Sequence, residues 1–425
     1  MKAYLVELRY SPLRWWFPIL TAADIITLFG RGQAWVGEWP QTSVASQISA
    51  FYFAPILAAV AAWSSGRVSR TNTASLFYSA ARPAWRMELA QLSATATFGL
   101  TAYGLGIATA TLVTWLSNPD AGFLWPGYVI LGAALLIGFA AAGHLVGRWW
   151  KAPFAAPAVS GLCGFLAIAW FGQPRQLGLF VLDGSPFYGI SWRAVIVRMA
   201  IAICLTGAAV TLKQPRIRRV TTVWTTPHIK ATQVCMSLVL LVSLAGLRLA
   251  GPVQTVRSIP SKPICTNAKP RICFWPEDSK YLPAAESMAV RITRLASFGF
   301  TVPDSFYERG LRGPDHGTDD FYVLDGSLWD ASITLAGQVT TSAIPKDCPL
   351  GKRQVHFSNS SLQEIGELNM WVTMYIFNGG QPADMHGGPP GVDLNGVARI
   401  LSWPQQQQYS WVQQHLVNER LIYCA

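Results

Sequence analysis

Residues 127–146 read GYVILGAALLIGFAAAGHLV, and this stretch decides the fold class. It contains no Lys, Arg, Asp or Glu. A helix needs roughly 20 mostly apolar residues to cross the hydrocarbon core of a bilayer, and this stretch has that length. It therefore predicts a membrane-spanning helix.

Six further apolar stretches have the same character, so we predict an α-helical polytopic membrane domain with about seven spans. The others are 15–30, 46–63, 89–116, 154–171, 194–212 and 231–249. The first is short and contains Asp24, and the second contains Pro55. Proline is tolerated in a span when neighbouring helices satisfy the freed backbone groups.

Small residues recur at helical spacing in two of these stretches. Gly143 and Gly147 form a Gly-x-x-x-Gly spacing in the fourth, and Ala102 and Gly106 have the same spacing in the third. Such residues let helix backbones approach closely in lipid. The spacing is common in Ala- and Gly-rich helices, so it is a weak indication of packing.

The charge distribution separates the chain into two parts. Residues 1–251 hold 19 Lys and Arg against 6 Asp and Glu, a net charge of +13. The remaining residues hold 14 against 16, a net charge of −2. The basic excess lies in short loops between apolar stretches, as in cytoplasmic loops of membrane proteins. It therefore gives no reason to expect nucleic acid as a partner.

Basic residues alternate between loops, which predicts the orientation. The segment before the first span and the loops after the second, fourth and sixth are basic, whereas the intervening loops are poor in Lys and Arg. The positive-inside rule then places the N-terminus in the cytoplasm. We expect a multi-pass protein of the cell membrane with a transmembrane domain at 1–251 and an extracytoplasmic domain at 252–425.

The second part has the composition of a small α+β domain behind a linker at 252–263. The capping box Ser361-Leu362-Gln363-Glu364 opens one predicted helix. Apolar residues at helical spacing mark two more, within 282–295 and 411–421. Short strands are predicted at 321–324, 332–336 and 397–402.

Four cysteines lie outside the predicted spans: Cys265, Cys273, Cys348 and Cys424. Four cysteines allow three connectivities. We favour Cys265–Cys273, which closes a short loop, and Cys348–Cys424, which ties down the C-terminus. A four-thiolate zinc site is the alternative. Zinc sites favour ligand pairs two to four residues apart, and these cysteines lack that spacing.

The sequence shows no arrangement typical of catalysis or of cofactor binding. It has no Gly-x-x-x-x-Gly-Lys-Ser/Thr segment, and so no phosphate-binding loop of its own. His415 and Glu419 lie four residues apart on a predicted helix. Two ligands do not make a metal site, so we interpret both as solvated surface residues.

Two charged residues fall inside predicted spans, Asp24 in the first and Arg198 in the sixth. Charges in the bilayer are costly and often mark a transport pathway or an ion pair. The alternative places Asp24 on a cavity wall and lets the long side chain of Arg198 reach the interface. The sequence leaves both interpretations open.

The order of these parts resembles a bacterial ABC-type export permease with a fused extracytoplasmic domain. A helix within 1–16 has the composition of one that lies in the cytoplasmic interface. A basic loop at 64–88 follows the second span, and the run from Ala61 to Trp85 is similar to one such permease group. Cys273-Phe274-Trp275-Pro276-Glu277 matches an element of the outer domain in that group. The seventh span departs from the family's six-helix core, because a domain fused after a cytoplasmic sixth end needs one more crossing.

The resemblance implies that the loop at 64–88 docks on a separate ABC ATPase subunit. The predicted docking residues are Arg67, Arg70, Phe77, Arg82, Trp85, Arg86 and Glu88. We therefore expect the membrane subunit of an ATP-driven exporter, without catalysis or cofactor of its own, in a homo- or heterodimer within the lipid bilayer. One alternative is a membrane-tethered receptor or sensor whose outer domain binds a ligand or an envelope partner. Another is an enzyme that uses the histidines and carboxylates of the outer domain.

Overall fold

The structure is a computed structural model that forms two compact units. It describes residues 2–30, 35–67, 84–117, 119, 122–150, 152–171, 188–212, 238, 241–242, 245–313, 320–323, 328–345, 359–378, 389 and 391–424. The first unit comprises 1–119 and 123–255, and the second comprises 120–122 and 256–425. The boundary therefore lies four residues beyond the one predicted from sequence.

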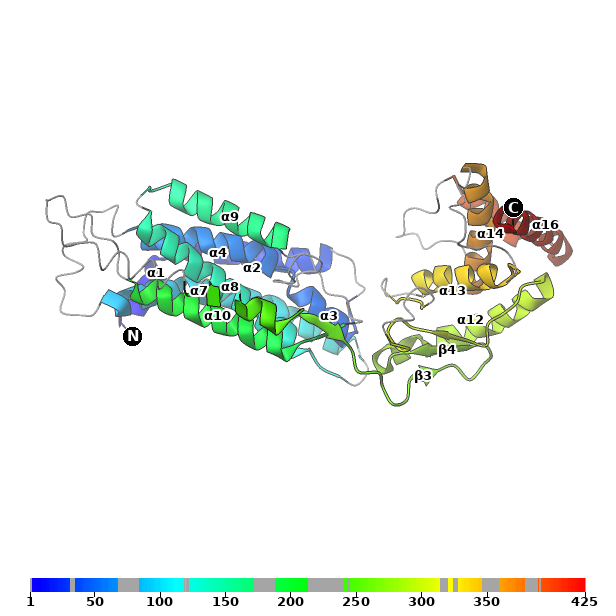
Figure 1. The fold of residues 1–425 in the computed structure, drawn as a ribbon, viewed down its shortest axis with the longest axis horizontal. Coiled ribbons are helices and arrows are strands. Elements are labelled where there is room, and N and C mark those ends of the chain that lie inside the picture. Colours follow the sequence, from blue (N-terminus) through cyan, green and yellow to red (C-terminus); the bar gives the residue numbers. More distant parts are fainter. Residues whose placement is uncertain are drawn as a thin grey trace. The chain divides into compact units, whose positions relative to one another are not determined.

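Helices make up almost all of the described first unit (Figure 1). They are α1 (Lys2–Tyr10), α2 (Leu13–Gly30), α3 (Trp39–Ser46), α4 (Ala50–Ser65), α7 (Ala84–Leu116), α8 (Pro126–Trp149), α9 (Ala155–Phe171) and α10 (Trp192–Thr211). The fold class is therefore that of a helical bundle, as predicted.

Four helical segments of the described chain are long and apolar enough to cross a membrane. They are Trp39–Ser65, Trp85–Leu116, Pro126–Trp149 and Trp192–Thr211. They cover four of the seven predicted spans, and the fifth predicted span is the shorter apolar helix Ala155–Trp170. The first predicted span forms α2, which contains Arg14 and Asp24. This helix is not among the four segments that are long and apolar enough to cross a membrane. Most of the seventh lies outside the described residues, although 245–250 are helical.

Close packing of α8 against α4 explains the glycine spacing in the fourth predicted span. A side chain at Gly143 would collide with the carbonyl of Ala58, and one at Gly147 would collide with that of Ala62. Figure 1 shows α4, α8 and α10 running side by side, and α8 contacts both of the other helices. Two glycines one turn apart thus let the α8 and α4 backbones touch.

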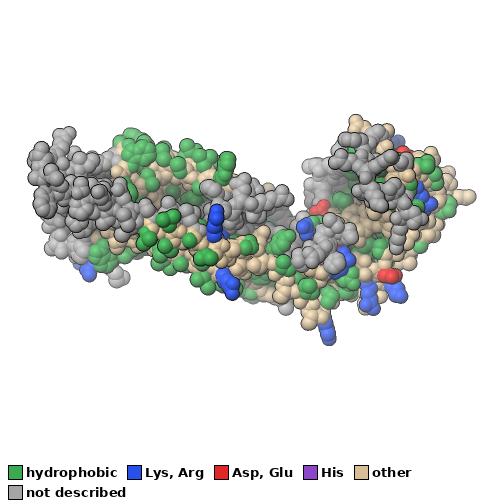
Figure 2. Space-filling view, viewed as in Figure 1, with side chains coloured by type: hydrophobic (Ala, Val, Ile, Leu, Met, Phe, Trp, Pro, Cys, Tyr) green, Lys and Arg blue, Asp and Glu red, His purple; other side chains and the backbone are tan. Residues whose placement is uncertain are grey.

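The outer surface of the bundle is apolar, as expected for a lipid-facing surface. Figure 2 shows hydrophobic side chains along α9. Leu162 and Trp170 of this helix are 59% and 68% exposed, and Phe154, just before it, is 74% exposed. Trp15 in α2 and Ile196 in α10 are similarly exposed. An apolar surface of this extent is unusual for a water-soluble monomer, and it fits a protein embedded in a bilayer.

The predicted linker at 252–263 is not free along its whole length. β2 (Gln254–Val256) pairs with β1 (Tyr188–Ile190) in a two-stranded sheet. Val253 is buried with Tyr128 and Ala194, and its carbonyl accepts a hydrogen bond from the backbone of Ser191. The start of the predicted linker therefore belongs to the bundle, because its apolar residue finds a buried site beside α8 and α10.

The second unit is an α+β domain with a three-stranded sheet at its N-terminal end. The strands are β3 (Ile264–Cys265), β4 (Arg271–Phe274) and β5 (Ser305–Tyr307), with β4 central, antiparallel to β3 and parallel to β5. The helices are η1 (Pro276–Tyr281), α12 (Leu282–Arg294), η2 (Leu295–Phe298), α13 (Trp329–Ser342), α14 (Asn359–Phe377), α15 (Leu394–Leu401) and α16 (Gln405–Cys424). One apolar core built around Trp371, Phe298 and Ile292 joins sheet and helices.

The three predicted helices of this domain are confirmed, although α14 begins at Asn359 and not at the predicted cap Ser361. Two of its predicted strands are wrong. Residues 332–336 lie in α13 and most of 397–402 lies in α15. Short apolar runs are ambiguous between strand and buried helix, and here the packing of α13 and α15 against α14 selects the helix. Of the third predicted strand, Phe321 forms only an isolated bridge with Glu308.

Candidate functional site

Three ionisable side chains meet in the interior of the bundle where α7, α8 and α10 come together. Glu88 Oε2 lies 2.9 Å from His144 Nε2, and Glu88 Oε1 lies 3.3 Å from Arg148 Nε. The side chains are 6%, 1% and 6% exposed in that order. Arg148 Nη1 also donates to the carbonyl of Ala209, at 2.5 Å. One carboxylate thus ties α7 to α8, and Arg148 carries the link on to α10.

The helix geometry accounts for this cluster. His144 and Arg148 are four residues apart, so they project from the same side of α8. Glu88 lies just beyond the first turn of α7, from where its carboxylate reaches the C-terminal end of α8. A buried charge of this kind persists only when it is paired and hydrogen-bonded. The cluster of Glu88, His144 and Arg148 therefore holds α7, α8 and α10 together, and we call it the joint between these helices.

The placement of Glu88 corrects a prediction from the sequence. It was assigned to the ATPase-docking loop, but it is 5% exposed and belongs to α7. A side chain buried among helices cannot contact a separate subunit. The charge of Glu88 is instead used inside the bundle, because Arg148 and His144 need a carboxylate partner there.

The other predicted docking residues are placed as follows. Trp85 and Arg86 form the exposed start of α7, and the Arg86 guanidinium lies 5.4 Å from the centre of the Trp85 ring. Arg67 makes two hydrogen bonds to Glu7 of α1, of 2.6 and 2.8 Å. Arg70, Phe77 and Arg82 lie outside the described residues.

The ion pair between Arg67 and Glu7 has a structural consequence. It connects the chain just beyond α4 with α1, which also packs against α7. Tyr4 of α1 is hydrogen-bonded to Thr97 of α7 at 2.8 Å. The N-terminal helix is therefore attached to the elements on both sides of the loop.

Both predicted intramembrane charges are buried. Asp24 is 4% exposed, and its Oδ2 has no hydrogen-bond partner among the described residues. It fits against α7 because residue 106 is glycine, since any side chain there would collide with the carboxylate. Arg198 is 6% exposed and donates to the carbonyl of Ala194, one turn earlier in α10. These positions fit the expectation that charges in spans lie inside the bundle.

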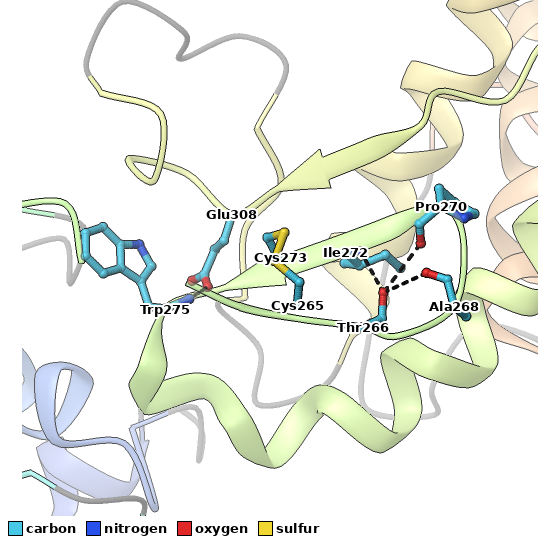
Figure 3. The surroundings of a disulfide bond; sticks show 8 residues. All are labelled: Cys265, Thr266, Ala268, Pro270, Ile272, Cys273, Trp275 and Glu308. Atoms are coloured by element: carbon cyan, nitrogen blue, oxygen red, sulfur yellow. Dashed lines mark hydrogen bonds between the residues drawn. A yellow bond between two sulfur atoms is a disulfide. The ribbon is translucent and has the colours of Figure 1, made fainter. Parts of the chain in front are cut away.

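A disulfide fastens the sheet of the second unit. Cys265 and Cys273 are bonded and lie directly opposite each other on β3 and β4 (Figure 3). Thr266 completes the turn, because its hydroxyl accepts a hydrogen bond from the backbone of Ile272, at 2.8 Å. The bond confirms the first predicted disulfide. It also excludes the four-thiolate zinc site, since a disulfide sulfur is not a thiolate.

Cys424 at the end of α16 is disulfide-bonded as well. Its predicted partner, Cys348, lies outside the described residues. Cys163 and Cys204, both in predicted spans, are free and exposed on the bundle. Cysteine usage therefore differs between the two units as the sequence suggested.

The segment Cys273–Glu277, which is buried as far as Trp275, forms a junction beside the disulfide. The Trp275 backbone donates to Glu308 Oε2 at 2.9 Å, and its indole donates to the carbonyl of Arg309 at 3.0 Å. Burial and the neighbouring Asp278 carboxyl group raise the pKa of Glu308 well above its ordinary value. Glu308 is 1% exposed, so it serves as a buried acceptor for this turn.

Arg257 closes the same junction from outside. Its guanidinium lies 3.8 Å from the centre of the Trp275 ring and 2.5 Å from Glu277 Oε1. The Trp-Pro-Glu sequence thus binds the chain segment that enters the domain. Among the described residues, the contacts of this sequence hold the domain together. They explain the choice of Trp275 and Glu277 without a ligand-binding role.

His415 and Glu419 are not the solvated surface pair that the sequence suggested. Glu419 is 4% exposed, and its Oε2 has no hydrogen-bond partner among the described residues. Burial raises its pKa to about 7. His415 is partly buried, and its ring packs at a tilt against that of Trp411, with ring centres 3.8 Å apart. The reason is that α16 packs this face against α14.

Sequence reasoning missed His144 and Arg148. His144 falls inside the fourth predicted span, and Arg148 falls in the basic loop that follows it. A signal existed in the four-residue spacing of two ionisable side chains at the end of an apolar helix. Their partner was not deducible, because Glu88 lies 56 residues from His144 in the chain.

Comparison with known proteins finds a similarity within the second unit. Residues 272–420 match the model of a domain of unknown function, DUF7224. The match begins in β4 and ends near the end of α16, so it covers most of the domain and none of the bundle. No curated protein and no solved structure matches the chain.

Proposed function

We propose that this chain is the membrane subunit of an ATP-driven exporter that docks on a separate ATPase through the loop at 64–88, with the buried Glu88 outside the contact surface. In this proposal the chain has seven spans, a cytoplasmic N-terminus and an outer C-terminal domain. Support comes from the alternation of basic loops, the resemblance to export permeases and the apolar surface of the bundle. The chain lacks a phosphate-binding loop of its own, so such a transporter needs an energy source in another subunit.

The observation that carries the proposal is the joint at the start of α7. The exposed pair Trp85 and Arg86 lies one turn before Glu88 in the same helix. Glu88 is held by His144 and Arg148. A force applied at the exposed turn would therefore act on α8 and α10 as well, because a helix transmits displacement along its axis and ion pairs resist separation.

The docking experiment compares two double variants that remove the same ring types. Phe77→Ala with Trp85→Ala alters the proposed docking site while keeping every charge. The matched control is Trp115→Ala, at the C-terminal end of α7, with Phe123→Ala, in the segment between α7 and α8, because both rings are exposed. We expect an ATPase that co-purifies with the wild type to be lost from the first variant and kept by the control. Equal recovery from all three proteins, or no ATPase with the wild type in mild detergent, would contradict the proposal.

Topology is tested separately, with a reporter that is active only in the cytoplasm. Fused after Ala425 it should be inactive, and fused after Leu212 it should be active. Activity after Ala425 would contradict seven spans and an outer domain. It would leave the docking result unaffected, so the two parts of the proposal fail independently.

A receptor or sensor remains the second candidate, and one observation favours it. The second unit has an open cavity lined by aromatic and amide side chains, which has no place in ATPase docking.

A further inference from the structure

Two adjoining cavities open on the second unit, where η2, α14 and the start of α16 meet. Their volumes are about 520 and 370 Å³, and they share Ser297, Phe298 and Gln405. The larger volume falls in the range of small-ligand sites, roughly 300–1,000 Å³. Together they form one groove, which we call the η2–α16 groove. It is lined by Thr293, Arg294, Ser297, Phe298, Tyr375, Gln405, Gln406, Gln408 and Tyr409.

The floor and the sides of the groove are fixed by contacts within the domain. Gln413 donates to the carbonyl of Phe298 at 2.6 Å, which holds α16 against η2. The Phe298 ring packs edge-on against Trp371, with ring centres 5.2 Å apart, and Tyr375 stacks on Trp371 at the same spacing. Gln408 is also engaged, since it donates to the carbonyls of Leu401 and Trp403. The groove is therefore a preformed feature.

Other lining side chains have unused hydrogen-bonding capacity. Gln405, Gln406, Arg294, Tyr375 and Tyr409 make no side-chain hydrogen bond to the described part of the protein. Each free amide offers two donors and one acceptor with two lone pairs, so it suits a partner that both donates and accepts, as a hydroxyl group does. The Tyr409 ring is 44% exposed and offers a flat apolar face beside these amides.

The charge of the lining indicates which ligands fit. It contains Arg294 and no carboxylate, so a cationic ligand would meet repulsion and an anionic one attraction. The guanidinium group is suited to bind a carboxylate through two hydrogen bonds. No strand lines the groove, so an extended peptide would find no sheet edge to pair with.

We propose that the η2–α16 groove binds an oligosaccharide that carries a carboxylate. Sugar hydroxyls pair with the free amides of Gln405 and Gln406, the apolar face of a pyranose ring stacks on Tyr409, and the carboxylate pairs with Arg294. The inference stands apart from ATPase docking, because it concerns only the second unit. It also does not require the topology proposal, because binding is measured on the purified protein.

The test uses the full chain in lipid nanodiscs on an array of oligosaccharides. The probes are oligomers that contain uronic, muramic or sialic acid, the same oligomers with the carboxylate reduced to an alcohol, and proline-rich peptides. We expect retention of one or more acidic oligomers and at least tenfold weaker binding of their reduced forms. Arg294→Gln should weaken binding of the acidic forms at least tenfold and leave the reduced forms unchanged.

Two further variants separate a binding role from a folding role. Tyr409→Ala removes a half-exposed ring and should weaken both forms at least tenfold, with an unchanged far-ultraviolet circular dichroism spectrum. Arg271→Gln, on β4, removes an exposed arginine distant in sequence from the groove and should change nothing. The proposal is overturned if no acidic oligomer is retained, if Tyr409→Ala and Arg294→Gln bind like the wild type, or if the proline-rich peptides bind instead and lose binding in these variants.

Discussion

Replacing Glu88 is the most direct test of the joint between α7, α8 and α10. Glu88→Ala leaves Arg148 buried without its carboxylate, and His144 loses the same partner. Breaking a buried ion pair by removing one partner costs about 3–5 kcal/mol. A single hydrogen bond between membrane helices averages only about 0.6 kcal/mol. The two magnitudes differ enough to distinguish a charged joint from an ordinary polar contact.

The assay is equilibrium unfolding of the bundle in mixed micelles with increasing dodecyl sulfate, for Glu88→Ala, Arg148→Met and the double variant. Arg148→Met should cost less than Glu88→Ala, because Glu88 keeps His144. The double variant should lose less stability than the sum of the losses in the two single variants. The difference, which is the coupling energy, should be about 2 kcal/mol or more. Arg14→Met serves as control, because Arg14 is exposed and should change stability by less than about 0.5 kcal/mol. A coupling energy below about 0.5 kcal/mol would refute the reasoning.

Three more predictions concern packing, the disulfide and a buried acid. Gly147→Leu should lower the free energy of unfolding by about 1–3 kcal/mol, because the new side chain would collide with the Ala62 carbonyl. Gly104→Leu is the control. It has open space around it and should unfold at the same dodecyl sulfate concentration as the wild type. Cys273→Ser should cost roughly 2–3 kcal/mol, as expected for a short closed loop, and should lower the melting temperature of the second unit. If Cys265 stays resistant to alkylation in this variant, the assigned pairing is wrong. Burial raises the pKa of Glu419 from its ordinary 4.5 to about 7 in the folded protein. The free energy of unfolding is therefore highest below pH 4.5 and falls by about 3 kcal/mol as the pH rises from 4.5 through 7. Glu419→Gln should therefore flatten the dependence of melting temperature on pH in this window, and an unchanged slope would contradict the assignment.

Features that depend on local sequence were predictable. The length and apolar character of 89–116, 127–146 and 194–212 were sufficient to identify α7, α8 and α10, because a bilayer sets the length of a helix that crosses it. The same holds for α12, α14 and α16, whose apolar residues recur at helical spacing. The Cys265–Cys273 bond was predictable from its short loop.

The sequence could not determine contacts between residues that are far apart in the chain, because neither residue of a contacting pair identifies the other. Glu88 looked like a loop charge until α7 placed it beside His144 and Arg148. The apolar run at 332–336 is compatible with a strand or with a buried helix. It forms part of α13, which packs against α14. Glu419 looked solvated because its own helix is polar, whereas the neighbouring α14 covers it and raises its pKa. The sequence thus determined the long apolar and amphipathic helices, because length and periodicity are local properties. The tertiary structure determined the state of the short apolar runs and which charges are buried, because both depend on what packs against each segment.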